Sequence, residues 1–249
     1  MSVRCVAWAT MMANTDLGYL LHSRPYRDSS LICDFLLEHH GRVALLYKGV
    51  RKAGKQGAKG RLLQPFAPLA ISFDGRNELK SGRMLEAAGV AAFLVGAQLY
   101  SGLYVNELLM RLLQREEPCP SLFEYYRQVI LALESGPLES TLRRFERQLL
   151  LELGYELTLL WDENGEPILP DHLYLYIPDQ GFSLATSATL DQPLRQRCFQ
   201  GRHLLAIEQH DYDEPEVAQA AKRLSRLALA PHLGDKPLHS RELFKQLSS

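Results

Sequence analysis

Residues 30–50, SLICDFLLEHHGRVALLYKGV, decide the fold of this chain. They contain two runs rich in aliphatic and aromatic residues, 30–38 and 41–50, and the runs meet at His39, His40 and Gly41. Short apolar runs separated by turn-forming residues predict an antiparallel hairpin. Similar runs lie on either side, LGYLLHSRPY at 17–26 and PLAISFDG at 68–75. Five or so strands in about 70 residues predict a small barrel or sandwich, because closure of a sheet removes its exposed edges.

From about residue 86 the pattern becomes helical. Residues 93–115 carry apolar residues at i, i+3, i+4 and i+7, which is typical of a buried helix. We predict further helices over 121–134, 140–153 and 214–230, with Ser121 and Ser140 as N-caps and Gly154 just past the third helix. Residues 155–212 are less regular, with a hairpin predicted at 178–181. The expected fold class is α+β, with an N-terminal β-barrel domain at 1–85 and a helical domain at 86–249 that contains a small β insertion at about 155–212.

The composition is that of a globular protein. Of 249 residues, 46% are hydrophobic and 23% are charged. No apolar run reaches the roughly 18–20 residues of a membrane span, and residues 1–14 lack the features of a signal peptide. We therefore expect a cytoplasmic protein with no membrane association. The four cysteines, Cys5, Cys33, Cys119 and Cys198, form no C-x-x-C pair, so free thiols in a reducing compartment are expected.

The net charge of −1 conceals an asymmetry along the chain. Residues 1–85 hold 13 Lys and Arg against 6 Asp and Glu, a balance of +7, whereas residues 86–249 hold 15 against 23, a balance of −8. A basic N-terminal part indicates a polyanionic partner.

The segment 48–61, KGVRKAGKQGAKGR, concentrates this positive charge. It contains six cations, four glycines and no acid, within a window from 39 to 73 that is also free of acids. Glycines let a backbone approach a ligand closely, and repeated Lys and Arg neutralise phosphates without regard to sequence. The hypothesis is a nucleic-acid site, and the alternative is a solvated loop that is basic by chance. The DNA-binding candidates are Arg42, Lys48, Arg51, Lys52, Lys55, Lys59 and Arg61.

Aromatic residues interleave with these charges and could stack on bases. The barrel region contains Tyr19, Tyr26, Phe35, Tyr47, Phe66 and Phe73. Strand alternation predicts that most of them point into the core. Tyr26 and Tyr47 are the stacking candidates, because each lies beside a basic residue at a strand end.

A second cluster of cations lies on the predicted helix 140–153. Arg143, Arg144 and Arg147 flank an apolar stripe that includes Phe145 and Leu149. One interpretation is pairing with the acidic residues Glu139 and Glu146. The other is a groove with a basic rim and an apolar floor, suited to an acidic peptide that ends in hydrophobic residues and a carboxylate.

The sequence contains no recognisable catalytic motif. It lacks a phosphate-binding Walker A loop, G-x-G-x-x-G, G-x-S-x-G and H-E-x-x-H. A Cys33–His pair would have no visible orienting third group. We therefore expect a protein that is not an enzyme and has no cofactor.

Four stretches taken together resemble the RecO family of bacterial recombination mediators. They are residues 20–52, 62–80 (LLQPFAPLAISFDGRNELK), 99–113 (LYSGLYVNELLMRLL) and 233–247 (LGDKPLHSRELFKQL), and they follow the family's order over nearly the whole chain. The resemblance implies an OB-fold for the N-terminal barrel, a helical second domain and no catalytic residues. It implies binding to single- and double-stranded DNA, with nucleoid association when bound, and annealing of complementary strands. It also implies action with RecR and with the acidic C-terminal tail of the single-strand binding protein SSB, and help in loading RecA.

The resemblance places the SSB-tail site at the LRRFE segment, with Arg143 as first choice, Arg144 as second and Arg147 beside them. One departure concerns metal, because many family members carry a four-cysteine zinc module in the second half. This chain keeps only Cys198 between about 155 and 200, and one thiol cannot close a tetrahedral site. We therefore predict no metal. Two alternatives stay open: a generic OB-fold binder of nucleic acid, including RNA, with no recombination role, and an enzyme with an unrecognised site.

Overall fold

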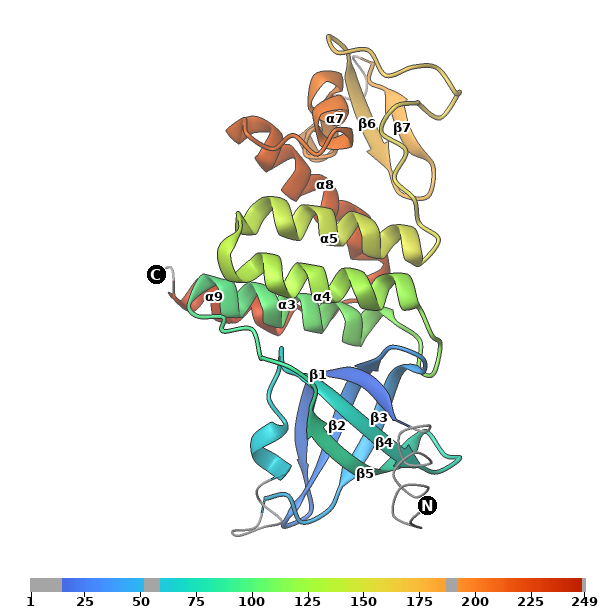
Figure 1. The fold of residues 1–249 in the computed structure, drawn as a ribbon. Coiled ribbons are helices and arrows are strands. Elements are labelled where there is room, and N and C mark those ends of the chain that lie inside the picture. The colour runs from blue at the N-terminus through green and yellow to red at the C-terminus, as the bar shows by residue number, and fades with distance from the viewer. Residues whose placement is uncertain (1–14, 52–58, 187–191, 248–249) are drawn as a thin grey trace, which may run out of the picture. The chain divides into compact units, whose positions relative to one another are not determined.

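The computed structural model describes residues 15–51, 59–186 and 192–247 (Figure 1). The chain divides into two compact units, Met1–Ser135 with Pro237–Ser249, and Gly136–Lys236. Among the described residues, the first unit therefore contains the barrel together with three α-helices. The expected domain boundary at 85/86 falls near the end of the last barrel strand and lies inside the first unit. That 1–85 and 86–249 are independent domains stays a prediction.

The N-terminal strands form a closed five-stranded barrel in the order β1-β2-β3-β5-β4. The strands are β1 Asp16–Tyr26, β2 Ser30–Leu37, β3 Gly41–Tyr47, β4 Pro68–Asp74 and β5 Leu79–Ala87. All neighbours pair antiparallel except β3 and β5, which pair parallel. This OB-like barrel confirms the predicted fold class. The sequence did not locate β5, because Lys80, Ser81 and Arg83 interrupt its apolar pattern.

The interior of the barrel is filled by alternate residues of each strand, including Leu20, Phe35, Leu45 and Ile71. The prediction that most aromatic residues of this region are core is confirmed, since Tyr19, Phe35, Tyr47 and Phe66 are buried. The predicted turn at 39–41 is also confirmed.

Gly41 starts β3 with φ +64°, a conformation that glycine adopts without strain. A Cβ there would also lie 2.0 Å from the backbone oxygen of Glu117.

Helices α3 (Ala97–Leu112) and α4 (Pro120–Ser135) pack on the outside of β1. Asn106 donates to the backbone oxygens of Leu20 and Leu21 at 3.3 and 3.2 Å, and it accepts a hydrogen bond from Tyr126 at 2.9 Å. Both helices were predicted, but Ser121 as N-cap was wrong. The helix begins at Pro120, because proline suits a first turn, and Ser121 lies inside it.

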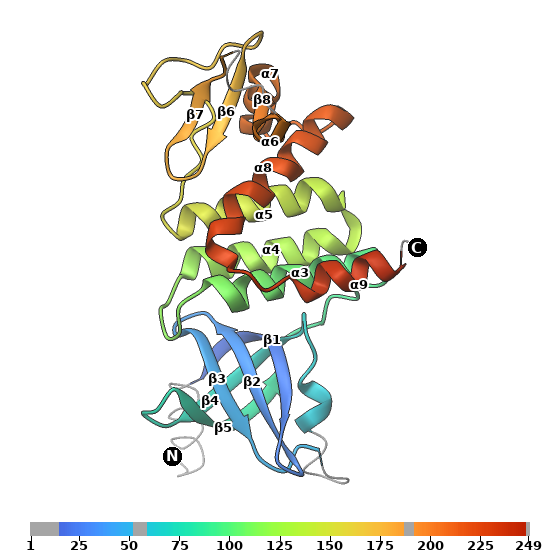
Figure 2. The ribbon, with the colours of Figure 1, turned by 180° about the vertical axis from the view of Figure 1, so that it is seen from behind.

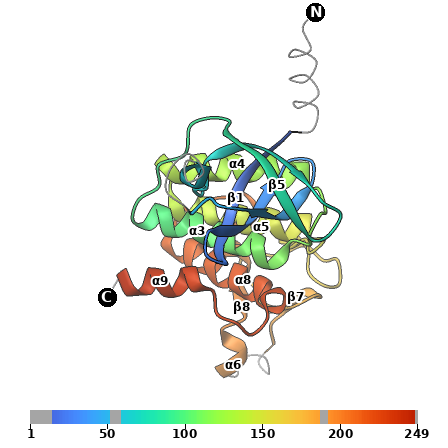
Figure 3. The same ribbon diagram turned by 90° about the horizontal axis from the view of Figure 1, so that it is seen from below.

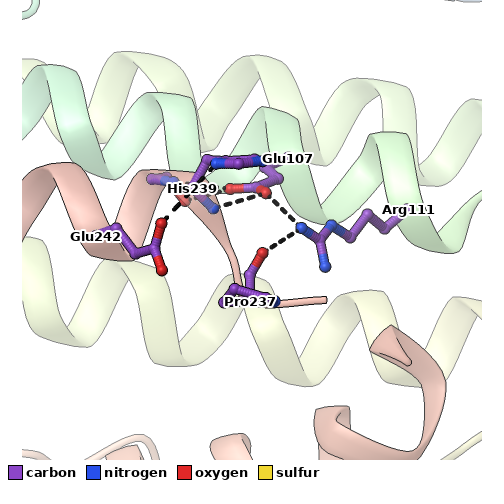
Figure 4. A network of polar contacts seen from close by, with 6 residues as sticks. Glu107, Arg111, Pro237, His239 and Glu242 are labelled. Atoms are coloured by element: carbon purple, nitrogen blue, oxygen red, sulfur yellow. Dashed lines mark hydrogen bonds and ion pairs between the residues drawn. The ribbon is translucent and has the colours of Figure 1, made fainter. Parts of the chain in front are cut away.

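The C-terminal helix α9 (His239–Leu247) packs against α3 within the same unit (Figures 1 and 2). Glu107 of α3 accepts hydrogen bonds from the backbone N–H groups of His239 and Ser240, and it pairs with Arg111 (Figure 4). Sequence periodicity did not identify this helix.

The second unit contains helices and a small sheet. The helices are α5 Leu138–Glu152, α6 Gln192–Arg195, α7 Gly201–Glu208 and α8 Pro215–Leu233, and the strands are β6 Leu173–Ile177, β7 Gly181–Leu184 and β8 Cys198–Gln200 in the order β7-β6-β8. The predicted insertion and its hairpin are confirmed, as is Gly154 past the end of α5, with φ +85°. Ser140 as N-cap was wrong, because α5 begins at Leu138 and the Ser140 hydroxyl donates back to Pro137 O at 3.2 Å. Within the described ranges, no helix is long and apolar enough to cross a membrane.

Candidate nucleic-acid interface

Two loops meet at the end of the barrel that faces away from α3 and α4 (Figure 1). One is the β1–β2 turn, and the other leaves β3 and leads to the short 3-10 helix η1 (Lys59–Leu62). The backbone N–H of Arg51 donates to Ser29 O at 3.0 Å, and its guanidinium donates to Arg27 O at 3.4 Å. These contacts hold the start of the basic segment against the β1–β2 turn. Figure 3 views the barrel from this end.

Exposed cations gather at and beside this end of the barrel. They are Arg24, Arg27, Lys48, Arg51, Lys59 and Arg61, and in the described part of the chain none of them forms an ion pair. Lys59 donates to the backbone oxygen of Arg83 at 3.1 Å. The predicted Lys52 and Lys55 lie outside the described residues. The surface therefore presents exposed cationic side chains, none of them neutralised by an ion pair among the described residues, that can meet phosphates.

Arg24 and Arg27 were not predicted from the sequence. The signal was present, since the stretch 22–29 (HSRPYRDS) carries both arginines, Arg24 near the end of the first predicted strand and Arg27 just after it. The hydrogen bonds of Arg51 to Ser29 and Arg27 show that the basic segment lies against the β1–β2 turn, beside these two arginines.

Tyr26 stands at the end of β1 and is partly exposed. The guanidinium of Arg27 lies over its ring, with the Cζ atom 5.3 Å from the centroid, a cation–π arrangement. Tyr26 therefore keeps its place as the stacking candidate.

Tyr47 lies inside the barrel, which corrects the expectation that it stacks on a base. It alternates in phase with the inward-facing Val43 and Leu45, and only 3% of it is exposed. A Cβ on Gly82 would lie 2.4 Å from its ring, so the ring fills the space that Gly82 leaves. Burial raises the pKa of the Tyr47 hydroxyl. Tyr47 is a core residue.

Arg42 is also withdrawn from the open surface. Its backbone oxygen accepts the N–H of Glu116, in the segment after α3, at 3.0 Å, and its side chain is partly buried. Burial lowers the pKa of Arg42, and the charge of Arg115 lowers it further. We therefore leave Arg42 out of the interface.

The segment after α3 crosses the outer face of β2 and β3. Arg115 lies 3.8 Å from the buried carboxylate of Asp34 on β2, and Glu116 pairs with Lys80 of β5 at 2.8 Å. OB-folds commonly bind oligonucleotides on the face of strands 2 and 3 and on nearby loops. Here that face is covered by the chain itself, and the exposed cations lie on the loops.

The three arginines of α5 differ in their surroundings. Arg143 is 5% exposed, and its guanidinium lies 2.9 Å from the buried carboxylate of Glu146. Arg147 pairs with Glu208 of α7 at 2.8 Å. The pairing interpretation is thus confirmed for Arg143 with Glu146. Its other half was wrong, because Glu139 pairs with Lys222 instead.

Arg144 is the exposed member of the three and donates to His210 O at 3.4 Å. A buried and paired Arg143 is poorly placed to meet a peptide carboxylate. The order of preference for a peptide site therefore reverses, with Arg144 first.

Three cysteines lie among the described residues, and none of them forms a disulfide there: Cys33 and Cys198 are buried in different units, and Cys119 is partly exposed. Burial raises the pKa of Cys33 to about 12, which keeps it a thiol. Within the described ranges, one group of side chains could share a metal ion: Asp16, Glu38 and His39 offer ligand atoms within 4.8 Å of one another. In the structure the buried Asp16 carboxylate instead lies 3.0 Å from Nδ1 of His39.

Comparison with known families agrees with this architecture. Residues 11–92 match the family described as "Recombination protein O N terminal", and residues 96–242 match "Recombination protein O C terminal". The chain belongs to the recombination protein O family. Three curated relatives are named DNA repair protein RecO. They come from Pseudomonas entomophila (strain L48), Pseudomonas paraeruginosa (strain DSM 24068 / PA7) and Pseudomonas putida (strain W619). They are 47%, 46% and 47% identical, over 92%, 91% and 92% of this chain and 96%, 92% and 96% of their own lengths. The RecO resemblance is confirmed, and membership of the RecO family supports a role in DNA repair.

Proposed function

We propose that this chain is a non-enzymatic DNA repair and recombination mediator that binds single- and double-stranded DNA at the loop end of its barrel. It anneals complementary strands and, with RecR, helps RecA to load on SSB-coated DNA. The observation that supports the DNA site is the set of six exposed cations around the β1–β2 turn and the segment after β3, without ion pairs among the described residues.

The chemistry of this surface suits annealing. Lysine and arginine contact phosphates, which carry no sequence information, so such a site accepts any strand. Because the backbone is held rather than the pairing edges of the bases, two bound strands can still form base pairs. Neutralising both backbones also lowers the repulsion between the strands. These properties require no catalytic group.

The proposed partners are those that the RecO resemblance implies, and charge supports one of them. An acidic peptide that ends in a carboxylate, such as the SSB tail, needs an exposed cation beside an apolar surface. Arg144 supplies an exposed guanidinium on α5, whereas Phe145 and Leu149 of the predicted apolar floor are buried, so Arg144 alone supports this site. RecR and RecA are proposed as further partners because the RecO resemblance implies them.

The DNA site is tested with the triple variant Lys48→Ala, Arg51→Ala and Arg61→Ala. A matched control removes three exposed cations elsewhere: Arg76, Arg195 and Arg226. Affinity for labelled single- and double-stranded DNA is measured between about 50 and 200 mM salt. Each lost phosphate contact should flatten the slope of log K against log salt by about 0.7–0.9, so the triple variant should lose about 2–3 and the control almost nothing. Equal effects from both variants would refute the site.

The mediator role is tested separately, by annealing of complementary oligonucleotides with and without SSB. The wild-type chain should anneal both bare and SSB-coated strands. Annealing of bare strands alone would favour the generic OB-fold alternative, and tighter binding to RNA than to DNA of the same sequence would favour an RNA-binding role. Turnover of nucleotides or nucleic acid by the purified protein would favour the enzyme alternative.

A further inference from the structure

The second unit contains a pocket of about 560 Å³ that the DNA-binding role does not use. The final turns of α5 and α8, the segment that follows α5, and the β6–β7 hairpin line it. This volume lies within the range of about 300–1,000 Å³ that small-ligand sites occupy.

Two large aromatic side chains of the pocket remain open to solvent. Tyr155 is 46% exposed and Trp161 is 49% exposed. The ring of Tyr155 lies against the imidazole of His232, with centroids 3.9 Å apart, so the tyrosine is held in place from α8. Exposed aromatic rings held in a concave surface are a common feature of recognition sites.

Within the described ranges, the pocket is lined by acidic residues and by no lysine or arginine. Four carboxylates line it, those of Glu156, Asp162, Glu163 and Asp179. The last turns of α5 and α8 add to this, because the C-terminal end of a helix carries a partial negative charge that favours cations. The pocket therefore disfavours phosphates and favours a positively charged group.

The acidic side chains are held by the fold rather than being loosely placed. The Asp162 carboxylate accepts hydrogen bonds from the backbone N–H groups of Asn164 and Glu166, both at 2.9 Å. Glu163 accepts a hydrogen bond from the Ser183 hydroxyl at 2.6 Å. A preorganised site loses less conformational entropy when a ligand binds.

We propose that this pocket receives an arginine or lysine side chain from a segment of a partner protein. The cation lies against the faces of Trp161 and Tyr155, and the surrounding carboxylates balance its charge. Cation–π contact with tryptophan is the strongest of its kind, and guanidinium groups stack well on aromatic faces. A basic protein segment is thus the occupant, and a nucleic-acid strand is excluded by its phosphates.

The test uses the fluorescence of Trp161 in the full-length chain. The sequence contains one other tryptophan, Trp8, so the Trp8→Phe variant makes Trp161 the sole reporter. Short peptides that alternate glycine with arginine, lysine or glutamate are the probes, and single-stranded DNA is the fourth ligand. We expect a saturable change in emission with the arginine and lysine peptides, weakened by salt, and none with the glutamate peptide or with DNA.

Two variants separate the pocket from general attraction to an acidic surface, with binding to a labelled arginine peptide as the readout. Trp161→Ala removes the ring. Glu156→Gln with Asp179→Asn removes two charges and keeps the shape, since asparagine tolerates the positive φ of 62° at Asp179. The control, Glu166→Gln with Asp171→Asn, removes two exposed charges outside the pocket.

Each pocket variant should weaken binding about three- to thirtyfold, and the control less than twofold. Three results would overturn the proposal: no saturable binding of either basic peptide, equal loss from the pocket and control variants, or quenching of Trp161 by DNA at the affinity of the peptides. Thermal unfolding of each variant identifies any loss of binding that is due to misfolding, and the charge variant, which preserves shape, then decides.

Discussion

Replacing Glu107 should release the C-terminal helix from the first unit. The carboxylate of Glu107 accepts hydrogen bonds from His239 N at 3.0 Å, from Ser240 N at 2.9 Å and from the Ser240 hydroxyl at 2.6 Å. Arg111 lies 2.9 Å from the same carboxylate and also donates to Pro237 O at 2.5 Å (Figure 4). The first N–H groups of a helix have no partner within it. Glu107 therefore caps α9 from a different helix.

The magnitude follows from these contacts. A hydrogen bond to a charged group contributes about 1.5–3 kcal/mol, and loss of a helix cap costs about 0.5–2 kcal/mol. The pair with Arg111 is partly exposed and adds less than about 1 kcal/mol. Because these contributions overlap, we expect Glu107→Ala to destabilise the attachment of α9 by about 2–4 kcal/mol. Glu107→Gln retains an acceptor oxygen and should cost about half as much.

The assay is hydrogen exchange followed by mass spectrometry. Peptides covering 239–247 should exchange about 30- to 1,000-fold faster in Glu107→Ala, since each 1.4 kcal/mol is a factor of ten. Peptides from the barrel strands should change much less. Glu86→Ala, which removes an exposed glutamate, is the control. Unchanged exchange at 239–247 would refute the reasoning.

The pH dependence gives an independent check on the same carboxylate. Burial raises the pKa of Glu107, but the bonds from Ser240 and His239 and the charge of Arg111 outweigh burial, so the pKa lies below 4.5. A folded-state pKa below the unfolded value contributes stability that is present above about pH 4.5 and is lost as the pH falls through the folded value. Protection of α9 should therefore decline on acidification in the wild type and decline less in Glu107→Gln.

Three further predictions concern the proposed sites. Tyr26→Ala should weaken binding of single-stranded DNA by about 1–3 kcal/mol per stacked base and leave stability unchanged. Tyr47→Ala should instead lower the urea midpoint of unfolding, because it leaves a cavity in the core. The reverse pattern would mean that the DNA site is not at this end of the barrel. Arg144→Ala should weaken binding of an SSB-tail peptide by about 1.5–3 kcal/mol, and an intact affinity would place the peptide site elsewhere. Arg143→Ala should instead cost about 3–5 kcal/mol of stability, because it removes the cation that lies 2.9 Å from the buried carboxylate of Glu146. Elemental analysis should find well under one zinc per chain, and stoichiometric zinc that resists dialysis would contradict the reading of the cysteines.

Local patterns predicted the barrel because they determine its strands. Alternation and turn residues placed β1 to β4, and Gly41 marked the hairpin. The fifth strand was not located because its sequence does not look apolar. Lys80 is buried there by residues that are its neighbours in space and not in the sequence. The helix starts at Pro120 and Leu138 were shifted by one or two residues, because proline competed with serine for the end of each helix.

The basic segment could be predicted because charge and glycine content are properties of sequence alone. The orientation of Tyr47 and the covering of Arg42 could not, because both depend on which face of β3 meets the interior and which meets the segment after α3. The pocket of the second unit could not be predicted either, because it depends on residues that are distant in the sequence. It brings Trp161 together with Tyr155 and His232, and the last of these is about 70 residues further along the chain.

The covered face of β2 and β3 bears on how a bound strand would be handled. An OB-fold that uses this face lays bases across the strands, where aromatic side chains stack on them. In this chain Asp34 of that face lies under Arg115, and the loop end offers cations with Tyr26 as the partly exposed aromatic of the predicted pair. A strand held in this way is bound mainly through its phosphates, so its affinity should depend steeply on salt and little on sequence. Its bases remain available to a second strand. The covering that removes base contacts is therefore consistent with annealing, in which a protein must hold a strand without competing for its pairing edges.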